Sequence, residues 1–323
     1  TGWLKEEGEW FYLHANGAIG NRSIETRLPE ALSLYKLPDK DGDIKTALSA
    51  SLRFLDIADH AMTFPLWACV WRAPLESLKN TTFVLWPYGP TGSLKSTLSA
   101  LALSHYGGPF QHNTLPGSFI STDNQVELLL FSAKDAPIVI DDYHPEHDPR
   151  HAAEIERRAN RLIRQVGNRT GRGRLRPDLT EAPERPPRGT VIATGEQLPL
   201  AVGSVAARIL PVPFSREKVD LGKLTQAQGE ANLYPYALRA YLKWLAPQLD
   251  SLASIIPQRF EELRAKATVD GHLRLPEVVA DLTLGIETGL RFFVEAGILS
   301  EEHAKELRDE AWSLFTELGR QHG

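Results

Sequence analysis

A short apolar strand that runs into a glycine-containing loop and then into a helix constrains the fold of this chain most. Residues 82–86 read Thr-Phe-Val-Leu-Trp, a run of β-branched and aromatic side chains typical of a buried strand. The loop that precedes the helix consists of Gly89, Pro90, Thr91, Gly92, Ser93, Leu94, Lys95, Ser96 and Thr97. This order predicts a phosphate-binding loop (P-loop), because glycines let backbone N–H groups turn inward and the helix start adds its positive dipole.

Three positions of the loop decide its chemistry. Lys95 is expected to bridge the β- and γ-phosphates of ATP, and Ser96 to ligate Mg²⁺. Leu94 stands where the pattern G-x-x-x-x-G-K-[ST] has its second glycine, so its side chain is expected to point away from the nucleotide. The alternative is a glycine-rich turn that only caps a helix. The lysine and serine directly after the loop favour the phosphate site.

A second apolar run ends in two carboxylates. Residues 136–140 read Ala-Pro-Ile-Val-Ile and are followed by Asp141 and Asp142. In a P-loop ATPase the first acid holds the water shell of Mg²⁺ and the next polarises the attacking water, so we assign these roles to Asp141 and Asp142 in that order. Histidines and acids continue to His151, but His144 and His147 flank a proline without regular ligand spacing. We therefore favour Mg²⁺ brought by the nucleotide over a separate zinc or iron site.

The remaining apolar runs set the fold class and the expected domains. Runs at residues 190–194 and 208–212, separated from the others by helical segments, predict an α/β P-loop fold with a parallel sheet covered by helices on both faces. We expect a small mixed region over 1–75, a P-loop ATPase domain over 76–220 and an α-helical domain over 221–323. The elements expected outside the sheet are a hairpin turning at 16–17 and helices at 44–62, 234–246, 248–267, 276–296 and 301–319.

The third and fourth runs carry a resemblance to a known family. Residues 193–199 read Ala-Thr-Gly-Glu-Gln-Leu-Pro, and residues 204–214 read Ser-Val-Ala-Ala-Arg-Ile-Leu-Pro-Val-Pro-Phe. From about residue 80 to 215 the chain resembles AAA+ ATPases of the helicase superfamily 3 and phage or plasmid primase-helicase kind. The resemblance implies that Thr194 or Glu196 is the sensor residue and that Arg208 is a finger reaching the γ-phosphate of a neighbouring subunit. ATPases of bacterial plasmids, phages and integrative elements share similar loops, Leu94 included.

Charge is concentrated in one segment. The net charge is −5, but residues 150–188 contain eleven arginines, no lysine and five acids, which makes the segment +6 and the rest −11. A helix over 154–165 would carry arginines along one side, and a loop with glycines follows it. The arginines expected to contact nucleic acid are Arg169, Arg172, Arg174 and Arg176. Guanidinium groups pair with phosphates, so we expect salt-dependent backbone contacts with single-stranded DNA. Alternatives are an intersubunit salt-bridge surface, a disordered basic loop and a solvated helix face.

These patterns predict an ATP-dependent DNA motor, a helicase or translocase of a mobile genetic element that self-associates into a ring, often a hexamer in the resembled family. Two alternatives use the same loop: a small-molecule kinase, and an ATP-dependent scaffold that does not hydrolyse ATP. Cys69 is the single cysteine, and neither a signal peptide nor a membrane span is evident, so a cytoplasmic location is expected. The chain begins at Thr1, which suggests a fragment of a longer protein.

Overall fold

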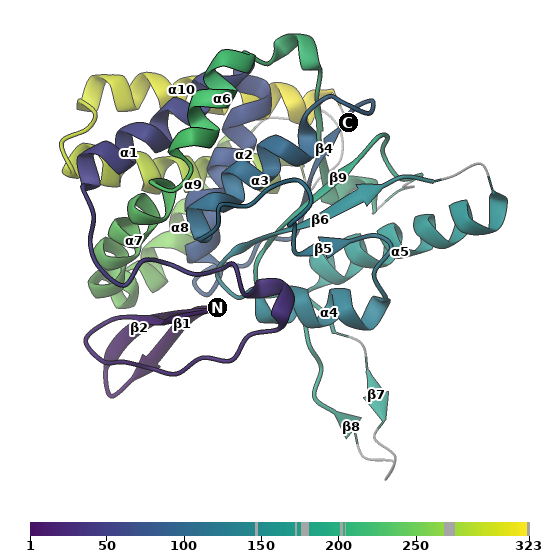
Figure 1. Cartoon of the computed structure of the whole chain (residues 1–323), viewed down its shortest axis with the longest axis horizontal. Helices are drawn as coiled ribbons and strands as arrows, with labels where there is room; N and C mark the ends of the chain where they lie inside the picture. Colours follow the sequence, from purple (N-terminus) through teal and green to yellow (C-terminus); the bar gives the residue numbers. More distant parts are fainter. Residues whose placement is uncertain are drawn as a thin grey trace.

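A five-stranded parallel sheet forms the centre of the protein, seen here in a computed structural model that describes residues 1–145, 148–171, 173–175, 181–200, 203, 205–267 and 275–321. The strands lie in the order β10-β4-β9-β6-β5 (Figure 1). Their bounds are β4 Val84–Tyr88, β5 Gly117–Ser118, β6 Pro137–Tyr143, β9 Thr190–Gly195 and β10 Ile209–Pro213. The predicted α/β class with a parallel sheet is therefore confirmed. Of the five strands in this sheet, the two-residue edge strand β5 was not predicted, because it is too short to show a pattern.

Helices cover both faces of this sheet. Helix α3 (Lys95–Leu103) crosses from β4 toward β5, whereas α4 (Asp123–Ser132) and α5 (Pro149–Asn168) cross back toward β4. Because crossover connections between parallel strands are right-handed, opposite directions of crossing place α3 on one face and α4 and α5 on the other (Figure 1). The carboxyl ends of all five strands consequently meet at one edge.

The region before the sheet combines a small antiparallel sheet with two helices. Strands β1 (Gly2–Glu6), β2 (Glu9–His14) and β3 (Gly17–Ile19) form a three-stranded antiparallel sheet, in which β2 and β3 make the predicted hairpin. The single helix predicted over 44–62 is wrong: α1 (Ile44–Arg53) is followed by a short 3₁₀ turn, and α2 (His60–Arg72) starts anew. The cause is Asp59, which accepts a hydrogen bond from the N–H of Ala61 and so caps a second helix, while Ala58 is extended and pairs with Val219.

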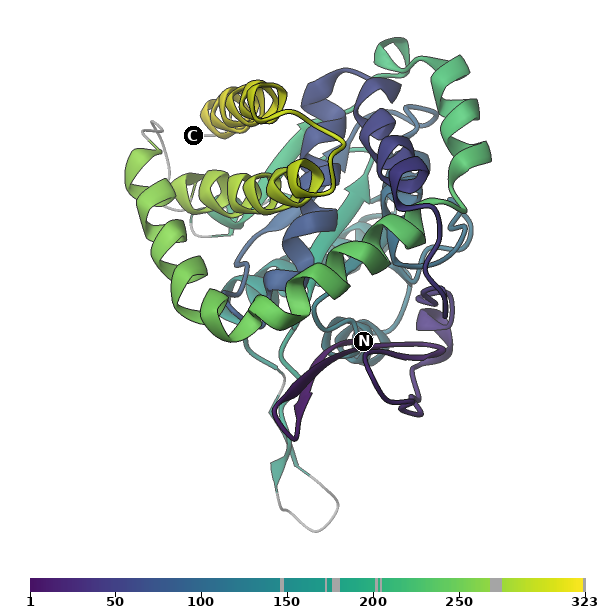
Figure 2. The ribbon, with the colours of Figure 1, turned by 90° about the vertical axis from the view of Figure 1, so that its left-hand side faces the viewer.

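The C-terminal third is helical, as predicted. It contains α6 (Leu221–Glu230), α7 (Tyr234–Leu245), α8 (Leu249–Lys266), α9 (Leu275–Glu295) and α10 (Glu301–Arg320). Helix α9 packs against both α8 and α10 (Figure 2). Ser300 caps α10 by accepting a hydrogen bond from the N–H of His303 at 3.1 Å. Among the described residues no helix is long and apolar enough to cross a membrane.

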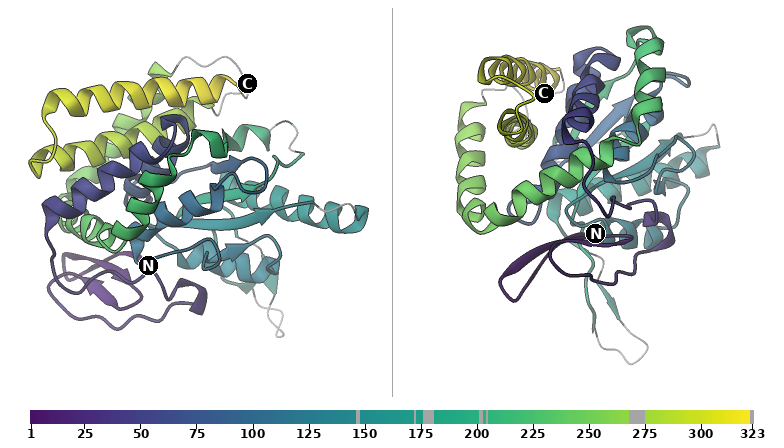
Figure 3. Two further views of the ribbon diagram at one scale, coloured as in Figure 1. Left: turned by 45° about the horizontal axis from the view of Figure 1, so that its top comes forward. Right: turned by 60° about the vertical axis from the view of Figure 1, so that its left-hand side comes forward.

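Close contact between α2 and α9 joins the first and last thirds of the chain (Figure 3). A methyl group added to Gly285 would stand 2.7 Å from the carbonyl oxygen of Ala68, and one added to Gly289 would stand 2.8 Å from Cγ of Trp71. Beside these glycines, Arg72 and Asp281 form a fully buried ion pair at 2.7 Å. The predicted boundaries after residues 75 and 220 therefore fall within one continuous hydrophobic core that runs from Trp3 to Leu318.

A buried hydrogen-bond chain links α1, α2 and the end of α3. The indole of Trp67 donates to Ser51 Oγ at 3.1 Å, and Ser51 Oγ lies 2.7 Å from Nε2 of His105. The Nδ1 atom of His105 lies 2.8 Å from the carbonyl oxygen of Ala102. A carbonyl can only accept, so Nδ1 carries the hydrogen and the neutral ring accepts the Ser51 hydroxyl at Nε2. Burial lowers the pKa of His105 to about 4, which keeps the ring neutral.

We expect the free energy of unfolding to decrease as the pH falls from about 6.5 toward about 4. In this window unfolded chains bind a proton at residue 105 and folded chains do not, so the loss from this site approaches about 3 kcal/mol. His14, whose pKa burial also lowers to about 4, contributes in the same direction. Urea unfolding across this window should therefore give a shallower pH dependence for His105→Gln than for wild type. Equal slopes would contradict the assignment.

Candidate functional site

One residue of the loop between β4 and α3, Leu94, has a backbone conformation that favours glycine. Leu94 has φ 68° and ψ 15°, in the left-handed region that usually takes glycine. This conformation costs a non-glycine residue roughly 1 kcal/mol or more. The side chain of Leu94 is half-buried and packs against the hydrophobic core, which offsets that cost. Gly89 is required for another reason: a methyl group there would stand 2.4 Å from the carbonyl oxygen of Phe214.

The start of α3 can receive an anion. Leu94 is the N-cap residue and makes no side-chain hydrogen bond to the first turn, so the N–H groups of that turn are available to a ligand. The ammonium group of Lys95, the first residue of the helix, folds back over the loop to 3.5 Å from the carbonyl oxygen of Pro90. A positive helix end and an ammonium group therefore face the same space.

The carboxylate of Asp141 collects side chains from three elements. Asp141 lies near the end of β6, and its Oδ1 accepts a hydrogen bond from Ser96 Oγ at 2.7 Å. The hydroxyl of Thr194, which is fully buried near the end of β9, donates to the same oxygen. The parallel register of β4, β9 and β6 causes this convergence, because it brings the carboxyl ends of neighbouring strands together. Three residues predicted from separate motifs thus meet in one site.

Asp142 occupies a bulge at the same edge. The pairing of β6 with β9 shifts between Ile140 and Tyr143, and Asp142 has φ 66° within this shift. Its N–H donates to Thr194 Oγ1 at 3.3 Å, and the residue is exposed. A bulge of this kind re-aims a side chain at the end of a strand, and aspartate tolerates the left-handed region better than most residues. Thr194 therefore holds both aspartates at once.

Glu196 reaches the loop from the next turn of the chain. Its Oε1 accepts a hydrogen bond from the hydroxyl of Thr91, and its Oε2 lies 3.0 Å from Nδ1 of His144. The Thr91 hydroxyl, with further help from His144 and Lys95, holds the pKa of Glu196 below its usual range, so the carboxylate is charged at neutral pH. Both proposed sensor residues, Thr194 and Glu196, are thus at the site. The sequence indicates His144 only as a possible metal ligand, because nothing local predicts its pairing with Glu196.

The donor atoms of this site fit Mg²⁺. A serine hydroxyl and a carboxylate are hard oxygen ligands, and Mg²⁺ in proteins is usually held by one or two carboxylates, substrate phosphates and water. Ser96 and Asp141 supply such oxygens 2.7 Å apart beside the loop. Glu146 and His147, two members of the acidic and histidine-rich stretch, lie outside the described residues. Among the residues that are described, no group of three or more His, Cys, Asp or Glu side chains could hold a metal.

Arg208 lies at the other end of the sheet. It directly precedes β10, and the five residues of this parallel strand separate it from the carboxyl edge by about 17 Å. Its side chain is 8% exposed and packs against Gly167 at the end of α5, where an added methyl group would meet Cδ of Arg208 at 2.2 Å. The structure therefore does not bring Arg208 together with Lys95 of the same chain.

Arg169, which was predicted to contact nucleic acid, is instead paired with residues of its own chain. Its guanidinium forms an ion pair with the buried carboxylate of Glu76 and donates to the carbonyl oxygens of Thr81 and Pro187, both at 2.7 Å. Burial pushes the pKa of Glu76 up, but the charges of Arg169 and Arg72 outweigh it and hold that pKa below its usual range. The guanidinium of Arg169 is therefore bound to other residues of its own chain, and it joins the end of α5 to the segment before β4.

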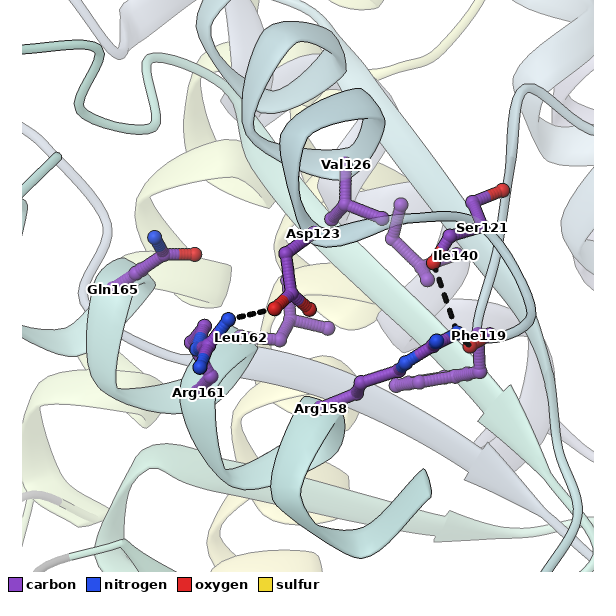
Figure 4. A pocket seen from close by; sticks show the side chains of 9 residues that line it. All are labelled: Phe119, Ser121, Asp123, Val126, Ile140, Arg158, Arg161, Leu162 and Gln165. Carbon is purple, nitrogen blue, oxygen red and sulfur yellow. Dashed lines mark hydrogen bonds and ion pairs between the residues drawn. The ribbon is translucent and has the colours of Figure 1, made fainter. Parts of the chain in front are cut away.

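The other basic residues divide into two groups. Arg158 and Arg161 of α5 point inward (Figure 4): Arg158 donates to the carbonyl oxygens of Phe119 and Ser121, and Arg161 pairs with Asp123. Only Arg157 and Arg164 of the predicted helical face are exposed.

Beyond α5, β7 (Arg174–Leu175) and β8 (Glu181–Ala182) form an antiparallel ribbon that projects from the body (Figures 1 and 2). Arg172 and Arg176 lie outside the described residues, and for Arg174 only the backbone is described.

Comparisons with known proteins agree with this architecture. A protein-family model described as a domain of unknown function (DUF927) matches residues 42–176, less than half of the chain. The fold is similar to that of "SCCmec type IV Cch - active helicase", with a TM-score of 0.64 and 16% sequence identity over 99% of this chain and 60% of that one. The chain thus spans about three fifths of the length of that helicase structure, and at this identity the likeness shows a shared fold.

Two further comparisons establish no relationship. The apo structure of the NrS-1 C-terminal region aligns with a TM-score of 0.38 and 13% identity, over 100% of this chain and 73% of that one, a score too low to establish a common fold. No curated protein sequence matches the chain.

We expect Arg169→Ala to lower the free energy of unfolding by about 3 kcal/mol, because it leaves the buried Glu76 carboxylate without its closest cation. Arg164→Ala on the exposed side of α5, the helix that ends just before Arg169, is the matched control and should stay within about 0.5 kcal/mol of wild type. Urea unfolding at neutral pH measures both. Equal stability of the two variants would refute the structural role of Arg169.

Proposed function

We propose that this chain is a P-loop ATPase and the engine of an oligomeric DNA motor, a helicase or translocase of a mobile genetic element. The observation that carries the proposal is the meeting of Ser96, Thr194 and Asp141 beside a loop with a left-handed Leu94. The likeness of the fold to a structure described as an active helicase supports the motor function.

Each residue of the site has a separate part in ATP hydrolysis. The N–H groups of the loop and Lys95 hold the β- and γ-phosphates, and Ser96 and Asp141 hold Mg²⁺, which neutralises phosphate charge when bound. Asp142 orients the attacking water and accepts its proton. The Thr194 hydroxyl fixes the Asp141 carboxylate and the N–H of Asp142, so it sets the geometry of both acids.

Assembly into a ring, with a hexamer as the expected form, gives Arg208 its role. Because Arg208 lies at the opposite end of the sheet from its own loop, the nucleotide it can serve is that of a neighbouring subunit. A guanidinium spreads positive charge over the transferring phosphoryl group and so favours hydrolysis at the interface. Reaching that nucleotide requires the side chain to leave Gly167, so we propose that nucleotide-driven assembly exposes it.

The ribbon formed by β7 and β8 is the proposed contact with single-stranded DNA. Both of its ends are anchored by arginines: Arg169 binds Glu76, and Arg188 donates to the carbonyl oxygen of Phe131 at 2.6 Å and stacks on its ring. Anchored ends let the ribbon project as a unit, and Arg172, Arg174 and Arg176 between them would pair with backbone phosphates.

We expect Mg²⁺-dependent release of phosphate from ATP, stimulated by single-stranded DNA and lowered at least about 100-fold by Lys95→Ala, because the lysine charge acts on the transferring phosphoryl. Lys305→Ala removes an exposed lysine from α10, outside the candidate site, and serves as the control. Turnover that ignores DNA would favour a small-molecule kinase. Tight ATP binding without phosphate release would favour a scaffold, and absence of ATP binding would refute the proposal.

We expect substitution of Arg172, Arg174 and Arg176 by alanine to weaken binding of single-stranded DNA. The slope of log K against log salt should become less steep by about 2, because three phosphate contacts are lost at about 0.7 each. The matched control replaces Lys305, Arg308 and Arg320 of α10, three basic residues away from the ribbon. Fluorescence anisotropy over a salt series measures both variants. Equal slopes in the two variants would exclude the ribbon as the DNA contact.

A further inference from the structure

The carboxylate of Glu196 stands at the mouth of the candidate nucleotide site. It binds the hydroxyl of Thr91, a residue of the loop itself, and the charge of Lys95 acts on it. The N–H of Glu196 donates to the carbonyl oxygen of Tyr143 at 3.2 Å, which fixes its backbone beside β6. The side chain is about one-third exposed (35%), so it can move while its backbone stays in place.

A carboxylate in this place conflicts with bound phosphates. A phosphate held by the loop and Lys95 would lie within a few ångströms of Glu196, and like charges at such distances repel measurably even at a partly exposed site. The loop hydroxyl of Thr91 cannot serve both anions fully. Glu196 therefore acts as an internal anion that occupies part of the phosphate site while the site is empty.

His144 offers the carboxylate a second position. Its Nδ1 lies 3.0 Å from the Glu196 oxygen that does not bind Thr91. His144 follows β6 directly and is half-exposed, so its ring can keep this contact while the glutamate turns away from the loop. Both states of the carboxylate thus have a partner.

We propose that Glu196 and His144 are positioning residues that set the affinity of the site for nucleotides according to their phosphate charge. Glu196 bonds Thr91 in the empty site, and an arriving triphosphate displaces the carboxylate onto His144. The inference rests on the proposed ATP site. It assigns His144 a role that no sequence motif indicates, and it gives Glu196 a role before the chemical step.

The test compares affinities for Mg²⁺ complexes of ADP and of a non-hydrolysable ATP analogue by isothermal titration calorimetry. Glu196→Gln keeps the hydrogen bond to Thr91 and removes the charge, so it should bind the ATP analogue about tenfold more tightly and ADP by a smaller factor. His144→Ala should weaken binding of the ATP analogue about threefold, but should have no effect when combined with Glu196→Gln, because the two residues act as one unit.

Glu306→Gln and His303→Ala make the same substitutions at exposed positions of α10 and should leave both affinities unchanged. Thermal unfolding of every variant shows that it is folded. Equal factors for ADP and the ATP analogue, or additive effects of the two substitutions, would overturn the inference while leaving the ATP site in place. If wild type binds neither nucleotide, the proposed function fails and this inference with it.

Discussion

The carboxylate of Asp141 accepts hydrogen bonds from Ser96 and Thr194, residues that stand 45 and 53 positions away in the chain. Such a meeting requires that β4, β9 and β6 are neighbours and run in the same direction, because only then do the ends of all three strands face one space. The strand order in turn requires α3 on one face and α4 and α5 on the other. One polar contact therefore depends on the whole sheet, and the geometry of the candidate site follows from it.

The opposite end of the sheet is held by buried charge. Arg169 pairs with Glu76, and Arg72 with Asp281, so the end of α5, the segment before β4 and helix α9 are tied together. Buried ion pairs add little net stability but strongly disfavour any arrangement that separates them. The basic ribbon leaves the body at this end, whereas the loop lies at the other. Helix α5 connects the two, which offers a rigid route between the proposed nucleotide and DNA contacts.

Local pattern predicted most of the sheet and the site. The glycine loop, the two aspartates near the end of β6 and the helices α7 to α10 were predicted within a few residues, because each has its signal in one contiguous run of the sequence. Helix α6 was not predicted. Prediction failed where contacts between residues distant in the sequence decide the local structure or the burial of a side chain. The helix expected over 44–62 breaks because Asp59 caps a new helix and Ala58 pairs with Val219. Arg169 lies in a basic segment that resembles a DNA contact, but its side chain is mostly buried because it pairs with Glu76, a residue far away in the sequence.

The sequence by itself determined the class of fold and most residues of the candidate site, since strand, loop and helix are adjacent in the chain and each has a local signal. The sequence also shows that residue 94 is a leucine where the phosphate-loop pattern has its second glycine. Only the tertiary structure decided that Leu94 could adopt a left-handed backbone, because the packing of its side chain on the core offsets the cost. It alone paired Glu196 with Thr91 and His144, and buried Arg208 against Gly167, because contacts between distant segments depend on how the strands are ordered.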